Sequence, residues 1–389
     1  MTAFSFKGVA DYNEITNLLA DLVSIDSVNP GYPGCRNGEK EISEYVYNYC
    51  KKIGIDCILD EVLPGRSNVV CFIKGRDRRG LCLESHMDTV SIKHMDIDPL
   101  NPIIKDGRMY GRGSSDDKGS LAAMMIAIKN ILMHNIKPST DLYFVASVDE
   151  EYQHRGIDHF LKKGIKLQGA VVGEPTQLDI VTACKGVVRW KITSIGKAGH
   201  SSRPDKGHNA IYDMVDFIEV MKNELIASLQ NKKHPLLGSP SLSVGCINGG
   251  SAVNIIPDQC TIEVDRRLLP GETSKTAKNE ILDIIAQLKK DEEIDINVSE
   301  PTTYAMPVDT DNHQIIVKTA ISSCTKIMGS SAIKGVDFGC DASSFTETGI
   351  PSIVFGPGSI LQAHTKDEFI CLEEVCRASE IYSQICIDF

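Results

Sequence analysis

The sequence lacks the segments that mark secreted and membrane proteins. Its first residues, MTAFSFKGVADYNEI, show no charged start followed by an apolar stretch, so we expect no secretion signal. No window approaches the roughly 18 apolar residues that a membrane-spanning helix needs. A dense run of Lys and Arg is also missing, and the formal net charge is -11. Because a nucleic-acid binder needs a basic face, we expect neither a nucleic acid nor a membrane as partner.

The cysteine pattern and two missing motifs narrow the chemistry. The 13 cysteines are odd in number, scattered, and never spaced as C-x-x-C. This usage is typical of a reduced compartment, where Cys serves as a small buried hydrophobe, so we expect a cytoplasmic protein without a disulfide framework. The motif G-x-S-x-G is absent, and no Cys stands in an identifiable nucleophile motif. A serine or cysteine hydrolase is therefore poorly supported.

The first half of the chain alternates helical spacing with short apolar runs. A chain of 389 residues is long enough for two domains, each with its own core. A helix is expected at about 118–134. Buried strands are expected at 68–73, 81–84, 142–148, 170–172 and 352–355. This alternation predicts an α/β protein in which helices flank a mostly parallel central sheet.

The pattern changes at about residue 187. Apolar and polar residues alternate from Val188 to Ile192, which is the period of a half-exposed strand. A helix, two strands, a helix and a final strand then follow, which predicts a smaller α+β domain inserted into a larger one. We expect the insert at 187–298 and the two parts of the larger domain at 1–186 and 299–389.

The first chemical motif is LCLESHMDTV, which follows an expected buried strand. His86 and Asp88 are two residues apart, so both side chains can project from the same face. Ligands of open parallel sheets gather at the carboxyl ends of the strands, and a His oriented by a carboxylate is common at zinc sites. A hydrogen-bonded His–Asp pair in a loop is the alternative, and an isolated H-x-D motif would favour it.

The second motif is YGRGSSDDKGS, in which Gly111 and Gly113 permit backbone angles that are closed to other residues. A dinucleotide-binding loop is disfavoured, because G-x-G-x-x-G would need Gly at the position of Asp116. Asp116 lies at the start of the expected helix and could cap it. The functional alternative is a carboxylate that bridges two cations about 3.5–4 Å apart.

Further carboxylates and a His follow other apolar strands. FVASVDEE places Asp149, Glu150 and Glu151 after one of them, AVVGEPT places Glu174 after another, and GPGSILQAHTKDEF carries His364. Three adjacent carboxylates at the end of a core strand repel one another and lose hydration, so something positive should compensate them. A solvated surface loop is the alternative for this acidic run.

Together the motifs supply five candidate metal ligands at strand ends of one expected sheet. They are His86, Asp116, Glu151, Glu174 and His364. A set of His, Asp and Glu without Cys suits catalytic zinc, with cobalt or manganese as substitutes. One bridging carboxylate and two private ligands for each ion would leave an open coordination position, which is typical of a catalytic site.

In this order the motifs resemble those of the zinc aminoacylase and carboxypeptidase family, the M20 metallopeptidases, which includes acetylornithine deacetylase and succinyl-diaminopimelate desuccinylase. The resemblance covers nearly the whole chain and implies two zinc ions in each subunit. His86 and Glu174 would hold one ion, Glu151 and His364 the other, and Asp116 would bridge them. The larger domain would then be the catalytic, zinc-binding domain.

The resemblance also implies roles for residues that do not bind metal. Asp88 would orient the zinc-bound His, and Glu150 would be the general base for a water molecule activated between the two ions. Many relatives place Met after the bridging Asp, whereas this chain has Asp117. At the metals, Asp117 would add negative charge and could tighten binding. We expect instead that it points outward from the first turn of the helix.

The insert carries three more motifs, GKAGHSSRP, GGSAVNIIP and DRRLLPG. The resemblance implies that the insert is a lid and dimerisation domain and that the protein is a homodimer. His200 would reach the active site of the partner subunit and stabilise the oxyanion, whereas Asn254 and Arg267 would bind the substrate. The bidentate fork of Arg267 suits a carboxylate. A loop His in a Gly-rich turn is the alternative for His200.

The expected function is hydrolysis of the amide bond of an N-acyl amino acid, most like that of acetylornithine deacetylase. Succinyl-diaminopimelate desuccinylase, dipeptidase and carboxypeptidase activities use the same metal motifs and stay open, so the expected substrate is a small N-acyl amino acid or a short peptide. A metal-binding scaffold without turnover is the alternative from another class of protein. All five expected ligand positions carry suitable residues, which disfavours an inactive protein.

Overall fold

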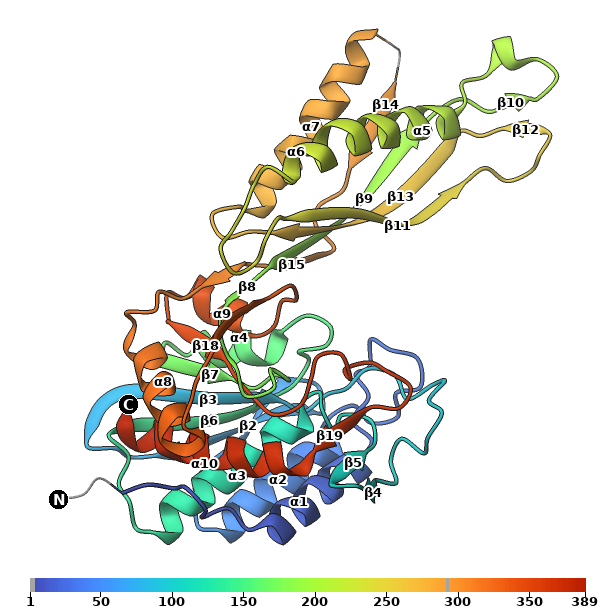
Figure 1. Cartoon of the computed structure of the whole chain (residues 1–389). Helices are drawn as coiled ribbons and strands as arrows, with labels where there is room; N and C mark the ends of the chain where they lie inside the picture. Colours follow the sequence, from blue (N-terminus) through green and yellow to red (C-terminus); the bar gives the residue numbers. More distant parts are fainter. Residues whose placement is uncertain (1–3, 292–293) are drawn as a thin grey trace. The chain divides into compact units, whose positions relative to one another are not determined.

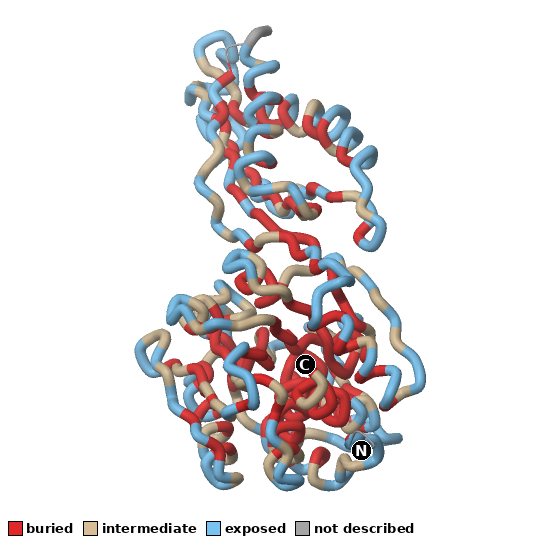
Figure 2. Tube along the Cα trace, turned by 90° about the vertical axis from the view of Figure 1, so that its left-hand side faces the viewer, coloured by how far each residue is buried: buried red, intermediate tan, exposed pale blue. Residues whose placement is uncertain are grey.

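The computed structural model describes residues 4–291 and 294–389, which divide into two compact units (Figure 1). The main unit contains the described residues up to Thr182, together with Thr310–Lys334 and Cys340–Phe389. The insert unit contains the described residues of Ala183–Asp309 and also Gly335–Gly339. Buried residues gather inside each unit, as Figure 2 shows, so each unit has its own core.

A mixed sheet runs through the main unit. Its strands are β1 (Asp56–Leu63), β2 (Arg66–Ile73), β3 (Asp77–His86), β6 (Thr140–Ser147), β7 (Leu167–Val172), β8 (Ile180–Cys184) and β18 (Ser352–Val354). They are arranged in the order β1-β2-β6-β3-β7-β18-β8. The central strands β6, β3, β7 and β18 are parallel, whereas β1, β2 and β8 pair antiparallel with their neighbours. The predicted α/β class with a mostly parallel central sheet is confirmed.

Helices cover both faces of this sheet. In Figure 1, α1 (Tyr12–Ser24), α3 (Lys118–Met133) and α10 (Leu372–Asp388) lie below the sheet, and α4 (Arg155–Leu161) and α9 (Ala342–Glu347) lie above it. Accordingly, β3 is buried without alternation from Gly80 to His86. The helix α3 contacts β3, α1 and α10, and every residue from Lys118 to Ile128 is buried. The apolar spacing alone suggested that one face of this helix is buried. In the structure, residues on all of its faces are buried.

Shorter elements complete the main unit. The helix α2 (Lys40–Lys52) packs against β1 and β2, and α8 (Ile315–Met328) packs against α10. Three short strands, β4 (Ile103–Lys105), β5 (Arg108–Tyr110) and β19 (Phe369–Cys371), form a separate antiparallel ladder. Because β5 precedes the loop that carries Asp116 and β19 follows the loop that carries His364, this ladder ties the two loops together. The strand β16 (Val308–Asp309), whose residues belong to the insert unit, pairs with Ala183 and Cys184 of β8. The strand β17 (Ile333–Val336) also pairs with β8.

The insert unit is an antiparallel sheet packed against helices, as predicted for an α+β domain. Its strands are β11 (Ser241–Gly249), β13 (Gln259–Leu268), β9 (Gly186–Ile195) and β14 (Asp295–Val298), in this order, and β15 (Thr303–Ala305) also pairs with β9. The core includes Trp190 of β9 and apolar residues of α5 (Ala210–Val220) and α7 (Ser274–Asp291). Two short elements, a π-helical segment (Met221–Ile226) and α6 (Ala227–Leu229), continue α5.

A second, two-stranded ladder in the insert unit joins β10 (Gly199–His200) to β12 (Ile255–Ile256), and a 3-10 helix follows β10 at Pro204–Lys206. Within the described ranges of the whole chain, none of the helices combines the length and the apolar character needed to cross a membrane. The 13 cysteines are free thiols, and most of them are buried, which is typical of Cys used as a small hydrophobic residue.

Candidate metal centre

The five predicted ligands lie at one edge of the main-unit sheet and in two loops beside it. His86 is the last residue of β3, Glu151 follows the end of β6, and Glu174 follows the end of β7. These three strands are parallel neighbours, so their carboxyl ends meet at the same edge of the sheet. Asp116 lies just before α3, and His364 lies between β18 and β19. The fold therefore brings together side chains that are far apart in the sequence.

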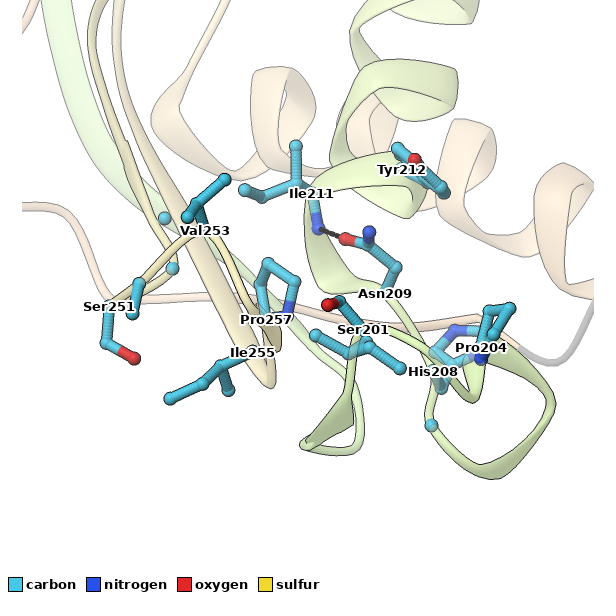
Figure 3. A pocket seen from close by; sticks show the side chains of 15 residues that line it. Ser201, Pro204, His208, Asn209, Ile211, Tyr212, Ser251, Val253, Ile255 and Pro257 are labelled. Atoms are coloured by element: carbon cyan, nitrogen blue, oxygen red, sulfur yellow. Dashed lines mark hydrogen bonds between the residues drawn. The ribbon is translucent and has the colours of Figure 1, made fainter.

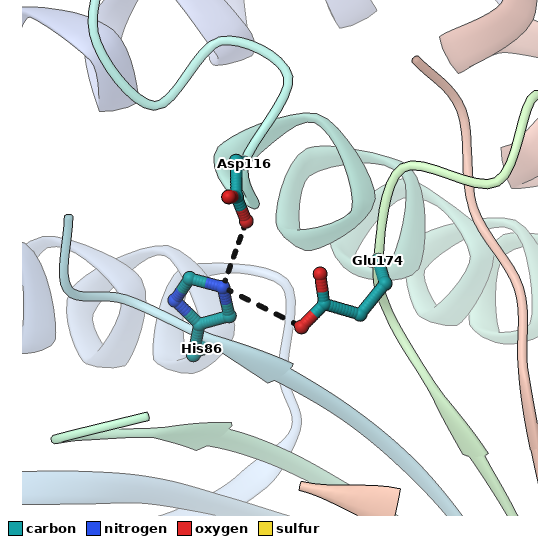
Figure 4. A group of neighbouring side chains, drawn as sticks. All are labelled: His86, Asp116 and Glu174. Carbon is teal, nitrogen blue, oxygen red and sulfur yellow. Dashed lines mark hydrogen bonds and ion pairs between the residues drawn. The ribbon is translucent and has the colours of Figure 1, made fainter. Parts of the chain in front are cut away.

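The ligand atoms form two groups that share Asp116. In the first group, Nε2 of His86 lies 3.2 Å from Oδ1 of Asp116 and 4.0 Å from Oε1 of Glu174 (Figure 4). In the second, Nε2 of His364 lies 3.3 Å from Oδ2 of Asp116 and 3.2 Å from Oε1 of Glu151. Each carboxylate oxygen of Asp116 thus faces a different His. A carboxylate with this placement can bridge two cations.

Burial and mutual repulsion dominate the electrostatics of the two groups. Burial raises the pKa of Glu174 well above its ordinary value, and the charges of Asp116 and Glu150 raise it further. Burial also raises the pKa of Glu151. Hydrogen bonds to Asp116 and Glu151 raise the pKa of His364 to about 10. The raised pKa values mean that bound protons reduce the repulsion between these carboxylates. Divalent cations would reduce the same repulsion, so the donor set fits the predicted ions.

Asp88 is completely buried beside His86 and connects it to the acidic loop after β6. Nδ1 of His86 lies 3.0 Å from the backbone carbonyl oxygen of Asp88 and 3.6 Å from its Oδ1. The carboxylate of Asp88 accepts hydrogen bonds from the side-chain amide of Asn29 (2.7 Å) and from the backbone N–H groups of Glu150 and Glu151 (both 3.1 Å). The residue predicted to orient the His ring thus also holds the loop that carries the predicted base.

The acidic run after β6 is not a solvated loop, so that alternative is wrong. Asp149 is completely buried, and the side chains of Glu150 and Glu151 are about 10% and 7% exposed. The positive charge that the sequence predicted beside these carboxylates is present at Asp149. Its Oδ1 accepts hydrogen bonds from the guanidinium groups of Arg66 and Arg155, both at 2.9 Å. These two cations offset the charge of Asp149, and the other two carboxylates are left for the centre.

Glu368, which was not among the predicted site residues, positions the predicted bridging residue Asp116. Its buried carboxylate accepts hydrogen bonds from the backbone N–H groups of Gly113 (3.0 Å), Ser115 (2.9 Å) and Asp116 (3.1 Å). It also accepts one from Nη1 of Arg112 at 2.7 Å. Glu368 lies only four residues after His364, within a motif that the sequence analysis singled out for that His alone. One carboxylate thus fixes the whole loop before α3.

Asp117 does not point outward, so this expectation is wrong. Its side chain is completely buried, and Oδ2 accepts a hydrogen bond from the hydroxyl of Ser85 at 2.6 Å. Burial raises the pKa of Asp117 to about 7. A Cβ at Gly173 would lie 2.7 Å from the same oxygen, so glycine at that position leaves room for the carboxylate. Because α3 is covered by the sheet and by other helices, its first turn is not a solvent-facing end.

The other three predicted site residues lie in the insert unit. His200 pairs with Ile255 in the β10–β12 ladder, and the backbone N–H of Ser201 donates to the carbonyl oxygen of Asn254 at 3.1 Å. His200 and Asn254 are therefore neighbours. Arg267 lies near the end of β13, where its Nε donates to Oδ1 of Asp265 at 2.7 Å. Within this unit the structure brings His200 and Asn254 together, but not Arg267.

A cavity of about 760 Å³ lies beside His200 and Asn254 in the insert unit (Figure 3). Its lining is mostly apolar or uncharged and includes Tyr212 and Val253. Asn209, which also lines it, caps α5 by accepting a hydrogen bond from the backbone of Ile211. None of the residues that line this cavity is an Asp or a Glu, so it offers no second set of carboxylates.

Comparison with known proteins gives matches over nearly the whole chain. Residues 82–388 match the model of peptidase family M20/M25/M40. The chain is 29% identical to an acetylornithine deacetylase from Aliivibrio fischeri, covering 96% of this chain and 98% of that protein. It is 28% identical to a probable succinyl-diaminopimelate desuccinylase from Staphylococcus epidermidis, covering 95% and 96%. A dinuclear metal-binding peptidase from Bacillus subtilis has a similar fold, with a TM-score of 0.74, 16% identity and 97% of both chains covered.

We expect the purified protein to bind two divalent ions per chain, which elemental analysis after dialysis would measure. Asp116→Ala should lose both ions, because its oxygens face both groups, whereas Glu174→Ala and His364→Ala should each lose one. His313→Ala is a matched control, since this exposed loop His lies outside both groups, and it should keep two ions. Two tightly bound ions in Asp116→Ala would contradict the bridging arrangement.

Proposed function

The chain belongs to peptidase family M20/M25/M40 and is a hydrolytic enzyme, and from this premise we propose that it is a di-zinc amidohydrolase acting on an N-acyl amino acid. The observation that carries the proposal is the position of Asp116, whose two oxygens face two separate groups of a His and a carboxylate. Both curated relatives are named for the removal of an acyl group, which supports this reaction. Acetylornithine deacetylase is the activity that we propose first.

In this proposal each of the two groups holds one zinc ion. His86 and Glu174 hold the first, His364 and Glu151 hold the second, and Asp116 is a ligand of both. His with carboxylates and without Cys is the ligand set of catalytic zinc, and cobalt or manganese would substitute. When bound, two such ions activate water for attack and polarise the scissile carbonyl. The similarity in fold to a peptidase that is described as dinuclear supports two ions.

Glu150 is proposed as the group that moves the proton. It stands beside the predicted ligand Glu151 but belongs to neither of the two groups that share Asp116, so neither proposed ion uses its carboxylate. Asp88 holds its backbone N–H at 3.1 Å. Burial raises the pKa of Glu150 well above its ordinary value, although the nearby charges of His154 and His86 oppose this shift. A carboxylate with a raised pKa suits a base that takes a proton from water and then returns it to the departing amine.

His200 is proposed to stabilise the oxyanion. The backbone N–H of Ser202 donates to Nδ1 of His200 at 3.2 Å. With Nδ1 as an acceptor, the ring proton is on Nε2, which makes Nε2 a hydrogen-bond donor. Such a donor is what a developing negative oxygen needs. Asn254, which lies beside His200, and Arg267 are proposed to bind the substrate, with Arg267 taking its carboxylate.

The distance between these residues within one insert unit supports a homodimer. The His200–Asn254 pair lies near Gln259, where β13 begins, whereas Arg267 is eight residues further along the strand. Eight residues of a strand span about 27 Å, which is much longer than an N-acyl amino acid. This length argues against one chain supplying both His200 and Arg267 to the same small substrate. We propose that His200 and Asn254 serve the active site of the partner subunit.

Succinyl-diaminopimelate desuccinylase is the second candidate activity, because a relative with that name matches nearly as well. Dipeptidase and carboxypeptidase activities are further alternatives within the same chemistry. A cytoplasmic location is proposed on the free, mostly buried cysteines, which suit a reduced compartment.

A substrate screen tests the proposed activity. The zinc-loaded protein should hydrolyse N-acetylornithine with a larger kcat/KM than N-succinyl-diaminopimelate or simple dipeptides, as measured by release of the free amine. Removal of the metal with a chelator should abolish this activity, and added zinc should restore it. Dominant dipeptide cleavage would replace the proposed activity with a peptidase activity.

Glu150→Gln tests the proposed base. Because only the proton acceptor is lost, kcat should fall by about 10²–10⁴-fold while two ions and the melting temperature are retained. Glu373→Gln is the control, since this glutamate is about 68% exposed and pairs with Arg377 on α10. Wild-type kcat in a metal-loaded Glu150→Gln protein would exclude Glu150 as the base.

Mixing two inactive variants tests the shared active site. His200→Ala and Glu150→Ala homodimers should each be inactive, but a mixed dimer should contain one site with both groups intact. We therefore expect activity to return after subunit exchange, up to about a quarter to a half of the wild-type value. Subunit exchange would be verified by mass spectrometry of differently tagged chains. No recovery in verified mixed dimers would place His200 in its own subunit's site.

A further inference from the structure

Glu150, His154 and Asp341 form a third group of ionisable side chains in the main unit. Nδ1 of His154 lies 2.7 Å from Oδ1 of Asp341 and 3.6 Å from Oε1 of Glu150. His154 directly precedes α4 and Asp341 directly precedes α9, and these two helices contact each other. The proposed metal ligands are not members of this group. The proposed base is therefore contacted by elements that supply nothing to the metal centre.

Asp341 holds the ring of His154 from inside the protein. It is completely buried, so its charge needs a partner within the fold. His154 supplies that partner at 2.7 Å, and the hydroxyl of Ser147 lies 3.3 Å from the other carboxylate oxygen. Burial opposes a charge on His154, but the hydrogen bond to Asp341 and the charges of Glu150 and Asp341 raise its pKa to about 9. The ion pair with the buried Asp341 favours the protonated, cationic ring, and the hydrogen bond fixes its orientation.

We propose that the His154–Asp341 pair positions the side chain of Glu150 for proton transfer. Asp341 fixes the imidazole ring, and the charge of the ring holds the Glu150 carboxylate in one orientation. The hydrogen bond from the backbone N–H of Glu150 to Asp88 fixes the main chain alone, and a free glutamate side chain would sample several rotamers. The inference rests on the proposed role of Glu150 as the base. His154 acts through Glu150 and is therefore a positioning residue.

The distances argue against a third metal ion in this group. Two ligands of one tetrahedral zinc ion, each about 2.0–2.1 Å from the metal, lie about 3.3 Å apart. Nδ1 of His154 and Oδ1 of Asp341 are only 2.7 Å apart, which is the distance of a charge-assisted hydrogen bond. This bond already pairs the His154 ring with the Asp341 carboxylate. The number of metal ions bound per chain distinguishes such a hydrogen-bonded pair from a third metal site.

The backbone of His154 offers variants that separate positioning from folding. Its φ of 56° and ψ of 21° lie in the left-handed region, which Gly and Asn adopt readily. His154→Asn keeps an N–H at the place of Nδ1, whereas His154→Gly removes the donor without straining the backbone. His159→Asn is a matched control, because His159 is also on α4 and also pairs with an aspartate, Asp60, at 3.4 Å.

The variants are tested as full-length, zinc-loaded proteins with N-acetylornithine, or with the best substrate of the screen. We expect His154→Gly to lower kcat by about 10²-fold, the loss typical of a misplaced catalytic group, with KM changed less than about twofold. The melting temperature and two bound ions should be retained. His154→Asn, which restores an N–H group but not the positive charge of the ring, should recover only part of the lost kcat, and His159→Asn should match the wild type. In a Glu150→Gln background, His154→Gly should lower kcat no further, because the group that it positions is gone.

Three results would overturn the inference. Wild-type kcat in His154→Gly would show that Glu150 needs no such support. An equal loss of kcat in the Glu150→Gln background would show that His154 acts independently of Glu150. One ion fewer in His154→Gly would make His154 a metal ligand. In each case the wild-type protein still hydrolyses its substrate and Glu150→Gln is still impaired, so the proposed function survives. A metal-loaded wild type that hydrolyses none of the screened amides would overturn both proposals.

Discussion

The placement of Asp116 between two imidazole rings is the constraint on which the rest of the main unit depends. Each of its oxygens must face a different His, and both must do so in a buried place that also contains Glu151 and Glu174. Such a cluster repels itself, so each carboxylate has to be held by something stronger than packing. Glu368 holds the loop of Asp116 through three backbone N–H groups. The parallel sheet does the same for the predicted ligands His86, Glu151 and Glu174, because it ends three strands at one edge.

The sequence predicted the residues that follow apolar strands, together with Asp88, but not the supporting residues Glu368 and Asp341. His86, Glu151 and Glu174 could be found because a parallel sheet collects its strand ends, so a polar residue after a buried run has a predictable place. Glu368 and Asp341 could not, since the residues around them contain no comparable apolar run and their partners lie far away in the sequence. Asp117 was placed wrongly because the first turn of a helix is ordinarily exposed, whereas α3 is covered on all sides.

The fold class and most element positions followed from apolar spacing, but the arrangement of the insert residues did not. A strand in which alternate residues are buried has a readable period, and β9 and β13 show it clearly. This alternation does not indicate which loop lies near which end of a strand. The pairing of β10 with β12 brings His200 beside Asn254, and the length of β13 separates both from Arg267. That length supports the proposed active site shared between two subunits more directly than any motif does.

Protons and metal ions compete for the same place in this centre. A His that binds a metal must give up its proton, yet the carboxylates around His86 and His364 raise the pKa of both rings. Without a bound metal ion, a proton on such a ring would offset part of the negative charge around it, and the buried carboxylates would repel one another less. The two proposed divalent ions would supply more positive charge than the protons they displace. The clustered carboxylates that attract protons to the two His rings therefore also attract cations. Metal binding must then release these protons, and the affinity for metal must fall as the pH falls.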